Sequence, residues 1–375
     1  MSSPTTVRAG GPSAGSAALA EAAFAGAGSQ EAADTARRTL ARCRDLVRPS
    51  LSAAIGRLHP WQGEMAAFSL GWCEAGGGPA DGAREGKGVR QALAVLCAEA
   101  AGAPGESGVA AAVAVELVHT FSLLHDDIMD GDGTRRQRET VWKAYGTGPA
   151  VLTGDALFAL AVQTLAEAPG PLTAEAVSRL SATLSGLAHG QAEDLLFEAR
   201  DWTGPDAVRL DEYRTMAELK TGTLLGCAAA LGGLLGGAPG SVVAALDRAG
   251  RHLGVAFQAV DDLLGVWGDP AVTGKPVHSD LRQRKKTYPV LAALASEGPR
   301  AVELAALLDS GTPLDDAGVR RAAALVEACG GRDATLDEAR RHLGAARACL
   351  RAVPLAPGAA HEIEALLGFL LHRSL

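Results

Sequence analysis

The chain has 375 residues, of which 47% are hydrophobic, 21% charged and only 4% aromatic. This is enough apolar material to bury a sizeable core, so the composition excludes a disordered protein. The formal net charge is −8 and there is no long Lys/Arg run, which argues against a nucleic-acid partner.

In chain order, residues 1–30 are an Ala, Gly and Ser mixture that predicts a disordered tail, and residues 31–375 are predicted to form one all-α domain. A helical pattern runs from about Glu31 to Leu58, and a Gly/Pro/Asp-rich loop follows at Gly76–Gly88. Between Gly108 and Asp130 there is no Gly or Pro, and apolar residues recur every three or four positions, which predicts a long buried helix. Further helices are predicted at about Ala174–Arg200, Leu210–Leu235, Val242–Val266, Tyr288–Ala295, Ala301–Leu308, Pro313–Ala328, Leu336–Ala352 and His361–His372.

The connections between these helices are short, and the chain shows neither a βαβ rhythm nor a solenoid repeat. We therefore expect a single large antiparallel helical bundle around a central cavity. Two helix starts are predicted from capping patterns, at Thr312-Pro313 and at Thr335 with Glu338 three residues later.

The six cysteines are widely spaced and include no CxxC pair, which is typical of reduced thiols in a cytosolic protein. The N-terminal segment lacks the basic start and apolar core of a signal peptide. Apolar runs elsewhere are short or interrupted by glycine, so we expect a cytoplasmic protein with no membrane span.

Two acidic segments, HDDIMDGD at His125–Asp132 and FQAVDDLLGVWGD at Phe257–Asp269, each follow an apolar helix. Residues four apart share a helix face, so Asp126 and Asp130 should point the same way. Like charges at this spacing repel, and a bound cation would reverse that cost. Because carboxylates without nearby Cys or His ligands suit a hard ion, the pattern predicts Mg²⁺. A lone acidic helix end would more often be solvated surface, but a second pair, Asp261-Asp262, weakens that alternative.

Basic residues follow both segments. Each one alone is more often a surface cation, but cations beside metal-binding carboxylates are what a diphosphate requires. The candidates are Arg135, Arg136, Lys220, Lys275, Lys285 and Lys286.

These motifs resemble those of the trans-isoprenyl diphosphate synthases, the polyprenyl synthetase family. The resemblance covers about Gly86–Pro289 and is ordered along the chain. It rests on GKGVR (Gly86–Arg90), His119, DDIMD (Asp126–Asp130), Arg135-Arg136, GDALF (Gly154–Phe158), GQAEDL (Gly190–Leu195), KTGTL (Lys220–Leu224), FQAVDD (Phe257–Asp262) and GDPAVTGKPVHSDLRQRKKTYP (Gly268–Pro289).

The resemblance implies an all-α isoprenoid synthase fold, a homodimer, and condensation of isopentenyl diphosphate with an allylic diphosphate. Mg²⁺ would be held by Asp126, Asp130 and Asp261, with Asp127 and Asp262 in support. The allylic diphosphate would be bound by Arg135, Lys220 and Lys275, with Thr221 and Gln258 lining the pocket. The second diphosphate would be bound by Lys87, Arg90, His119 and Arg136.

The sequence departs from the family pattern in three motifs. GKGVR lacks the middle arginine and the proline of GGKRxRP, which weakens the inference for the second diphosphate site. Gly265 stands where the second motif has its third aspartate, although Asp269 follows one turn later. Gln137 replaces a common glycine, and the sequence offers no physical reason for that change.

Residues one turn before the first aspartate should lie deeper in the cavity, where bulk would stop a growing chain. Phe121 is large and lies five residues before Asp126, whereas Ser122 is small and lies four before. This pattern resembles bacterial C20 synthases and predicts geranylgeranyl diphosphate as product. The alternative for Phe121 is plain core packing.

Other functions stay open at this point. A farnesyl (C15) or longer-chain synthase would share the motifs. A class I terpene cyclase would ionise a prenyl diphosphate without needing Lys87, Arg90 and His119. An inactive partner subunit would tend to lose one aspartate motif, and a purely structural bundle would need neither.

Overall fold

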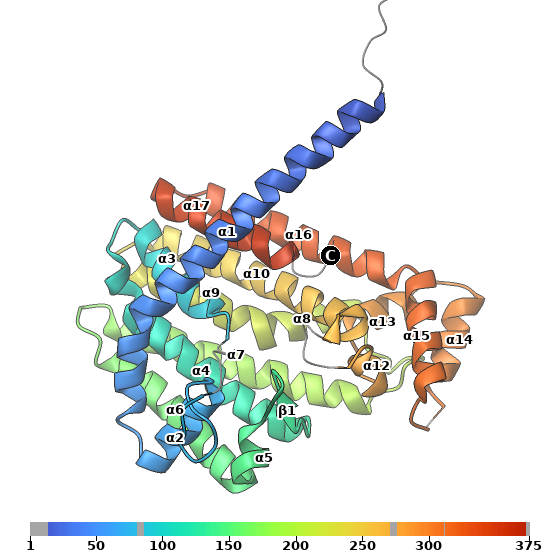
Figure 1. The fold of residues 1–375 in the computed structure, drawn as a ribbon, viewed down its shortest axis with the longest axis horizontal. Helices are drawn as coiled ribbons and strands as arrows, with labels where there is room; N and C mark the ends of the chain where they lie inside the picture. The colour runs from blue at the N-terminus through green and yellow to red at the C-terminus, as the bar shows by residue number, and fades with distance from the viewer. Residues whose placement is uncertain (1–13, 81–85, 271–275, 311, 373–375) are drawn as a thin grey trace, which may run out of the picture.

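The structure is a computed structural model that describes residues 14–80, 86–270, 276–310 and 312–372. It is almost entirely helical (Figure 1), which confirms the predicted all-α class. The N-terminal half of the bundle comprises α1 (Ala14–Ile55), α2 (Pro60–Ser69), α3 (Val89–Ala100), η1 (Gly105–Gly108), α4 (Val109–Met129), β1 (Thr134–Arg135), β2 (Arg138–Glu139), α5 (Val141–Tyr145) and α6 (Thr147–Ala166).

The rest of the described chain continues with longer helices and then shorter ones. These are α7 (Thr173–Ala199), α8 (Leu210–Ala217), η2 (Glu218–Gly222), α9 (Thr223–Leu235), α10 (Gly240–Trp267), α12 (Ser279–Arg282), α13 (Tyr288–Leu294), α14 (Pro299–Leu308), α15 (Asp316–Ala328), α16 (Gly331–Arg351) and α17 (Pro357–His372).

The main core lies among α3, α4, α6, α9 and α10, where Leu96, Leu117, Leu157, Leu231 and Leu246 are fully buried. Helix α10 packs along both α9 and α16, and α4 packs along α6 and α3. A smaller core lies among helices α12, α13, α14 and α15 at one end of the bundle (Figure 1). Both aspartate helices, α4 and α10, are therefore held by apolar contacts along their length.

Helix boundaries differ from the sequence predictions at three places. Helix α1 begins at Ala14, so residues 14–30 are helical where a disordered tail was predicted; alanine is the strongest helix former, and this part of α1 projects from the bundle (Figure 1). Helix α15 begins at Asp316 because Asp315 is its N-cap, accepting from the Gly318 amide at 2.7 Å, so the predicted start at Pro313 is wrong.

The third difference is the start of α16. Thr335 is not an N-cap but is fully buried inside the helix, where its hydroxyl donates to the Gly331 carbonyl at 2.6 Å. The helix starts immediately after Gly330, whose φ of 78° makes the turn from α15. Helix α6 and the β1–β2 hairpin were not predicted at all.

Two helices, residues 105–129 and 147–166, are long and apolar enough to cross a membrane. The first contains α4, a central helix of the bundle whose most apolar stretch is 61% buried, as expected for a core helix. The second, α6, lies at the surface with only 39% of its most apolar stretch buried. The exposed face of α6 therefore needs an explanation.

Candidate functional site

Three carboxylates of the first aspartate motif lie on the last turn of α4, and they have different surroundings. Asp127 is only 5% exposed and accepts from Nε of Arg135 at 2.7 Å. Asp126 and Asp130 are one turn apart and only partly buried, and Oδ2 of Asp130 accepts from Nζ of Lys285 at 3.1 Å. The helix thus uses Asp127 to hold an arginine and presents Asp126 and Asp130 together, as the spacing predicts.

The surroundings of Asp126 disfavour its ionised form. Burial raises its pKa to about 6, and the neighbouring Asp130 and Asp194 add to that effect, while Lys220 and Arg135 oppose it. A carboxylate in this state gains from a nearby cation more than an ordinary surface aspartate does.

Two lysines from other segments donate to carboxylates in this region. Nζ of Lys220, from η2, donates to Oδ2 of Asp194 on α7 at 2.6 Å, and Lys285 donates to Asp130. The pKa of Lys220 is raised, because the negative charges of Asp194 and Asp126 outweigh the opposing effect of burial. The next residue, Lys286, points elsewhere, with its ammonium 4.4 Å from the centre of the Trp202 ring. The region around Asp126 is therefore lined by fully charged ammonium groups from two segments.

The Lys220 segment is a single π-helical turn between α8 and α9, and such turns often occur at functional sites. Thr221, in the same turn, is buried and donates its hydroxyl to Oε1 of Gln258 on α10 at 2.9 Å. Gln258 donates in turn to Oδ1 of Asp262 at 3.0 Å. The chain of bonds ties the Lys220 turn to the second aspartate motif.

The second motif separates its two aspartates, because adjacent residues of a helix point about 100° apart. Asp261 is exposed. Asp262 is 3% exposed, and its Oδ2 accepts from the Tyr213 hydroxyl and from the Tyr288 amide, the latter at 2.8 Å. Burial raises the pKa of Asp262 to about 7. Its surroundings are those of a structural support and not of an open metal ligand.

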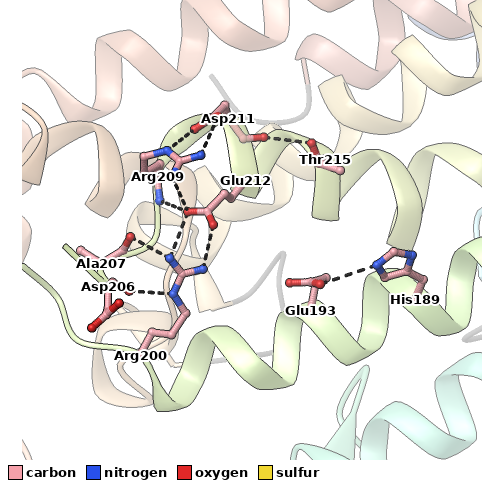
Figure 2. Close-up of polar contacts among 9 residues, drawn as sticks. All are labelled: His189, Glu193, Arg200, Asp206, Ala207, Arg209, Asp211, Glu212 and Thr215. Carbon is pink, nitrogen blue, oxygen red and sulfur yellow. Dashed lines mark hydrogen bonds and ion pairs between the residues drawn. The ribbon is translucent and has the colours of Figure 1, made fainter.

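Polar contacts hold the start of α8, the helix that carries Tyr213 (Figure 2). Arg200, at the end of α7, donates to both carboxylate oxygens of Glu212, at 3.0 and 3.1 Å, and from Nε to the Asp206 carbonyl at 2.7 Å. Glu212 also accepts from the Arg209 amide at 2.9 Å at the start of α8. These contacts hold the helix turn that carries Tyr213.

A second group of cations lies around His119. Nη1 of Arg90 is 3.2 Å from Nε2 of His119, and because a guanidinium only donates, this histidine nitrogen accepts. Burial and then the arginines at positions 90, 136 and 135 lower the pKa of His119 well below its usual value, so the ring is neutral. Lys87, three residues before Arg90 in the chain, is exposed.

The backbone explains one departure from the family pattern, and at a second it explains the glycine that this chain has replaced. Gly88 precedes α3 with a φ of 66°, a conformation that strains any residue with a side chain, so an arginine there would need a different loop. Arg136 and Gln137 form the two-residue turn of the β1–β2 hairpin with φ of 52° and 63°. Glycine is favoured at such a position, which accounts for its presence in the family pattern.

The predicted length-setting residues lie on the stretch of α4 before Asp126. The Phe121 ring meets the His125 ring edge-on at 5.0 Å between centroids, and Phe158 of α6 at 5.8 Å. Ser122 donates its hydroxyl to the His119 carbonyl at 2.9 Å, so it adds little bulk. Phe121 is packed against the core but only partly buried.

The sequence analysis assigned no role to two residues that the structure places in the site. One predicted residue lies outside the described residues. Asp194 belongs to the GQAEDL motif, but nothing in its spacing reveals that it faces Lys220. Tyr213 belongs to no motif. Lys275 lies outside the described residues, so its predicted role stays a prediction.

The side-chain atoms near Asp126 that could coordinate a metal are carboxylate oxygens, which suit a hard divalent cation. Within the described residues, no three His, Cys, Asp or Glu side chains gather closely enough to hold an ion by themselves. Mg²⁺ is usually bound by one or two carboxylates and completed by phosphate oxygens. The arrangement therefore fits an ion that arrives with a diphosphate.

Comparison with known proteins decides the family. The sequence profile of polyprenyl synthetases matches residues 82–326. The chain belongs to the polyprenyl synthetase family. It is a trans-prenyltransferase, and the family depends on a divalent metal ion.

Two relatives from Mycobacterium tuberculosis (strain ATCC 25618 / H37Rv) differ in their named product. One, a (2E,6E)-farnesyl diphosphate synthase, is 42% identical over 344 residues, covering 90% of this chain and 94% of its own. The other, a geranylgeranyl diphosphate synthase, is 46% identical over 300 residues, covering 80% of this chain and 84% of its own. Overall identity therefore does not separate a C15 from a C20 product.

Solved structures of the family share the fold. A polyprenyl synthetase from Streptomyces coelicolor A3(2) is 47% identical with a TM-score of 0.83, covering 89% of this chain and 98% of its own. A polyprenyl synthase from Caulobacter crescentus CB15, complexed with calcium and isoprenyl diphosphate, is 28% identical with a TM-score of 0.77, covering 92% and 98%. The polyprenyl synthetase fold of this chain is thus confirmed.

Proposed function

We propose that this polyprenyl synthetase condenses isopentenyl diphosphate with an allylic diphosphate by head-to-tail (1'-4) elongation, and that its product is geranylgeranyl diphosphate (C20). The observation that carries the proposal is the presence of two separate cationic groups. In one, Lys285 donates to Asp130, and Lys220 donates to Asp194 and lies close enough to Asp126 for their charges to interact. The other, Arg90 with Arg136, surrounds the neutral His119. Two anion sites are what two diphosphate substrates require.

Asp126, Asp130 and Asp261 would hold the Mg²⁺ ions, as the calcium bound with isoprenyl diphosphate in the Caulobacter relative supports. The metal would neutralise the charge that develops on the departing allylic diphosphate. Lys220 and Lys285 donate to carboxylates here, and both ammonium groups would turn to phosphate oxygens when a diphosphate binds. Arg135, held by Asp127, would stabilise the same developing charge.

The second group would position isopentenyl diphosphate. Arg90 and Arg136 supply charge, Lys87 is free to approach from the loop, and His119 keeps Arg90 in place through Nε2. The double bond of this substrate would attack the allylic cation. Loss of a proton from the condensed intermediate to the released diphosphate would then restore an alkene. Positioning and electrostatics carry such a reaction, with no protein nucleophile.

The decisive assay offers isopentenyl diphosphate with each of the C5, C10 and C15 allylic primers and analyses product length. We expect elongation that stops at C20. Cyclic hydrocarbon released from geranylgeranyl diphosphate alone would instead indicate a terpene cyclase. No turnover of any primer with Mg²⁺ would indicate an inactive partner subunit.

Replacing Phe121 by Ala is expected to lengthen the main product by one or more C5 units, because the ring that ends the tail's path is removed. Phe121→Leu should give a smaller shift, since it keeps most of the bulk. The measurement is chromatography of the dephosphorylated products. If the Ala variant makes the wild-type product, Phe121 is core packing and another residue sets the length.

We also propose that the protein is a homodimer that uses the exposed face of α6. Val151, Leu152 and Phe158 are 38%, 56% and 39% exposed, a density of apolar side chains suited to a second copy of the chain. A soluble dimer agrees with the predicted cytoplasmic location, which stays a prediction.

Leu152→Arg should convert the dimer to monomers in size-exclusion chromatography with light scattering, because it places charge in an apolar interface. Val302→Arg is the matched control: Val302 on α14 is 69% exposed, and among the described residues no other exposed large apolar side chain lies on that helix. A wild-type protein that is monomeric at micromolar concentration would contradict the proposal.

A further inference from the structure

The second aspartate motif lacks a carboxylate one turn after Asp261, where Gly265 stands, whereas the first motif has Asp130 one turn after Asp126. The structure shows what occupies that place. A Cβ atom built on Gly265 would overlap the carboxylate of Asp280, with Oδ1 at 2.7 Å and Oδ2 and Cγ closer still. The Asp280 carboxylate therefore lies where a side chain of residue 265 would begin.

Asp280 is fixed there by its neighbours on α12. The Ser279 hydroxyl lies 3.3 Å from the Gly265 carbonyl and 3.2 Å from Oδ1 of Asp280. Nδ1 of His278 lies 2.5 Å from the Val266 carbonyl. Residues 278–280 thus dock as a unit on the last turns of α10. This contact needs glycine at 265, because any side chain would displace the carboxylate.

The same segment reaches the first aspartate motif. The amide of Lys285 donates to the Asp280 carbonyl at 2.9 Å, and its ammonium donates to Asp130 at 3.1 Å. The charge of Asp280 acts on both sides, since it contributes to raising the pKa of Lys285 and that of Asp262. Asp280 therefore lies against the end of α10, in the same short segment as the lysine that contacts Asp130.

We propose that Asp280 supplies the third carboxylate of the second aspartate motif, and that Gly265 is the space that admits it. In this chain the carboxylate comes from α12 and lies where a side chain of residue 265, one turn after Asp261 on α10, would begin. Asp280 would bind the divalent cation that accompanies a diphosphate, either directly or through a water coordinated to the cation. The proposal rests on the proposed function, because it concerns the same metal site.

The test measures binding, not turnover. Full-length protein is titrated with Mg²⁺ in the presence of inorganic diphosphate, by calorimetry and by the rise in melting temperature. Asp280→Asn is expected to weaken Mg²⁺ binding about 10-fold to 100-fold, the usual effect of removing a carboxylate that supports a metal. Gly265→Ala should weaken it in the same direction with no charge removed. The exchange Gly265→Asp with Asp280→Gly should restore most of the affinity.

Two controls separate the possible failures. Asp337→Asn removes an exposed aspartate on α16 and should bind Mg²⁺ as the wild type does. Asp126→Asn should lose binding if the proposed function holds. If Asp126→Asn loses binding and Asp280→Asn does not, the role of Asp280 is refuted and the proposed function survives. If neither variant changes binding, both are refuted. If Asp280→Asn and Gly265→Ala lower the metal-free melting temperature but leave Mg²⁺ affinity unchanged, Asp280 only docks α12.

Discussion

Asp126→Asn is expected to lower turnover by about 10²-fold to 10³-fold, the scale seen when one electrostatic stabiliser of a transition state is removed. The amide keeps the size of the side chain but loses the charge that would hold a divalent cation. Folding should be retained, because burial already raises the pKa of Asp126 to about 6 and the uncharged form suits its surroundings. Steady-state rates at saturating Mg²⁺, with circular dichroism to verify the fold, measure this effect.

The pH dependence gives the same prediction a second test. Mg²⁺ needs the ionised carboxylate, so wild-type affinity for Mg²⁺ with diphosphate should fall as pH drops through about 6. Asp126→Asn should bind Mg²⁺ too weakly at any of these pH values to show the decline. A variant within a fewfold of wild-type turnover, or one that keeps the acid decline, would show that Asp126 holds no metal ion.

Asp262→Leu is expected to lower the free energy of unfolding by about 3 kcal/mol or more, because it leaves several buried donors unsatisfied at about 1–3 kcal/mol each. These donors are the Tyr213 hydroxyl, the Tyr288 amide and the Gln258 amide group. Asp262→Asn should cost much less. Its carbonyl can accept from both tyrosines, and a reversed Gln258 amide can accept from the new NH₂ group. Urea unfolding of both variants at one protein concentration measures the difference.

The sign of the pH effect follows from the raised pKa. Burial shifts the Asp262 pKa from 3.8 to about 7, so the folded state favours the protonated acid. The stability this provides is present at low pH and is lost as pH rises through about 7. The deficit of Asp262→Leu should therefore be larger at pH 5 than at pH 8. Equal stability of the Leu and Asn variants would show that the buried bonds contribute little.

Periodicity and motif spacing predicted much of this molecule. The long apolar pattern before Asp126 predicted α4, and the four-residue spacing placed Asp126 and Asp130 on one face. These features depend only on local helix geometry, which the sequence expresses directly. The basic residues near each motif were also identified from the sequence, although which of Lys285 and Lys286 enters the site was not.

Contacts between segments that are far apart in the sequence could not be predicted from local sequence patterns. Asp194 and Lys220 are 26 positions apart, and Tyr213 and Asp262 are 49 apart, so no local rule pairs them. Asp261 and Asp262 read as one pair in the sequence, but packing buries one and exposes the other. The starts of α15 and α16 were misplaced because a competing cap at Asp315 and a turn at Gly330 decided them.

By itself, the sequence of this polyprenyl synthetase determined an all-α chain with two carboxylate-bearing helices and enough cations for two diphosphates. Tertiary structure alone decided how these charges are shared. It assigned Asp127 to Arg135 and Asp262 to two tyrosines, and brought the Asp280 carboxylate against Gly265. The reason is physical: helix periodicity follows from neighbours in the chain, whereas burial and ion pairing depend on which distant surfaces meet when the bundle packs.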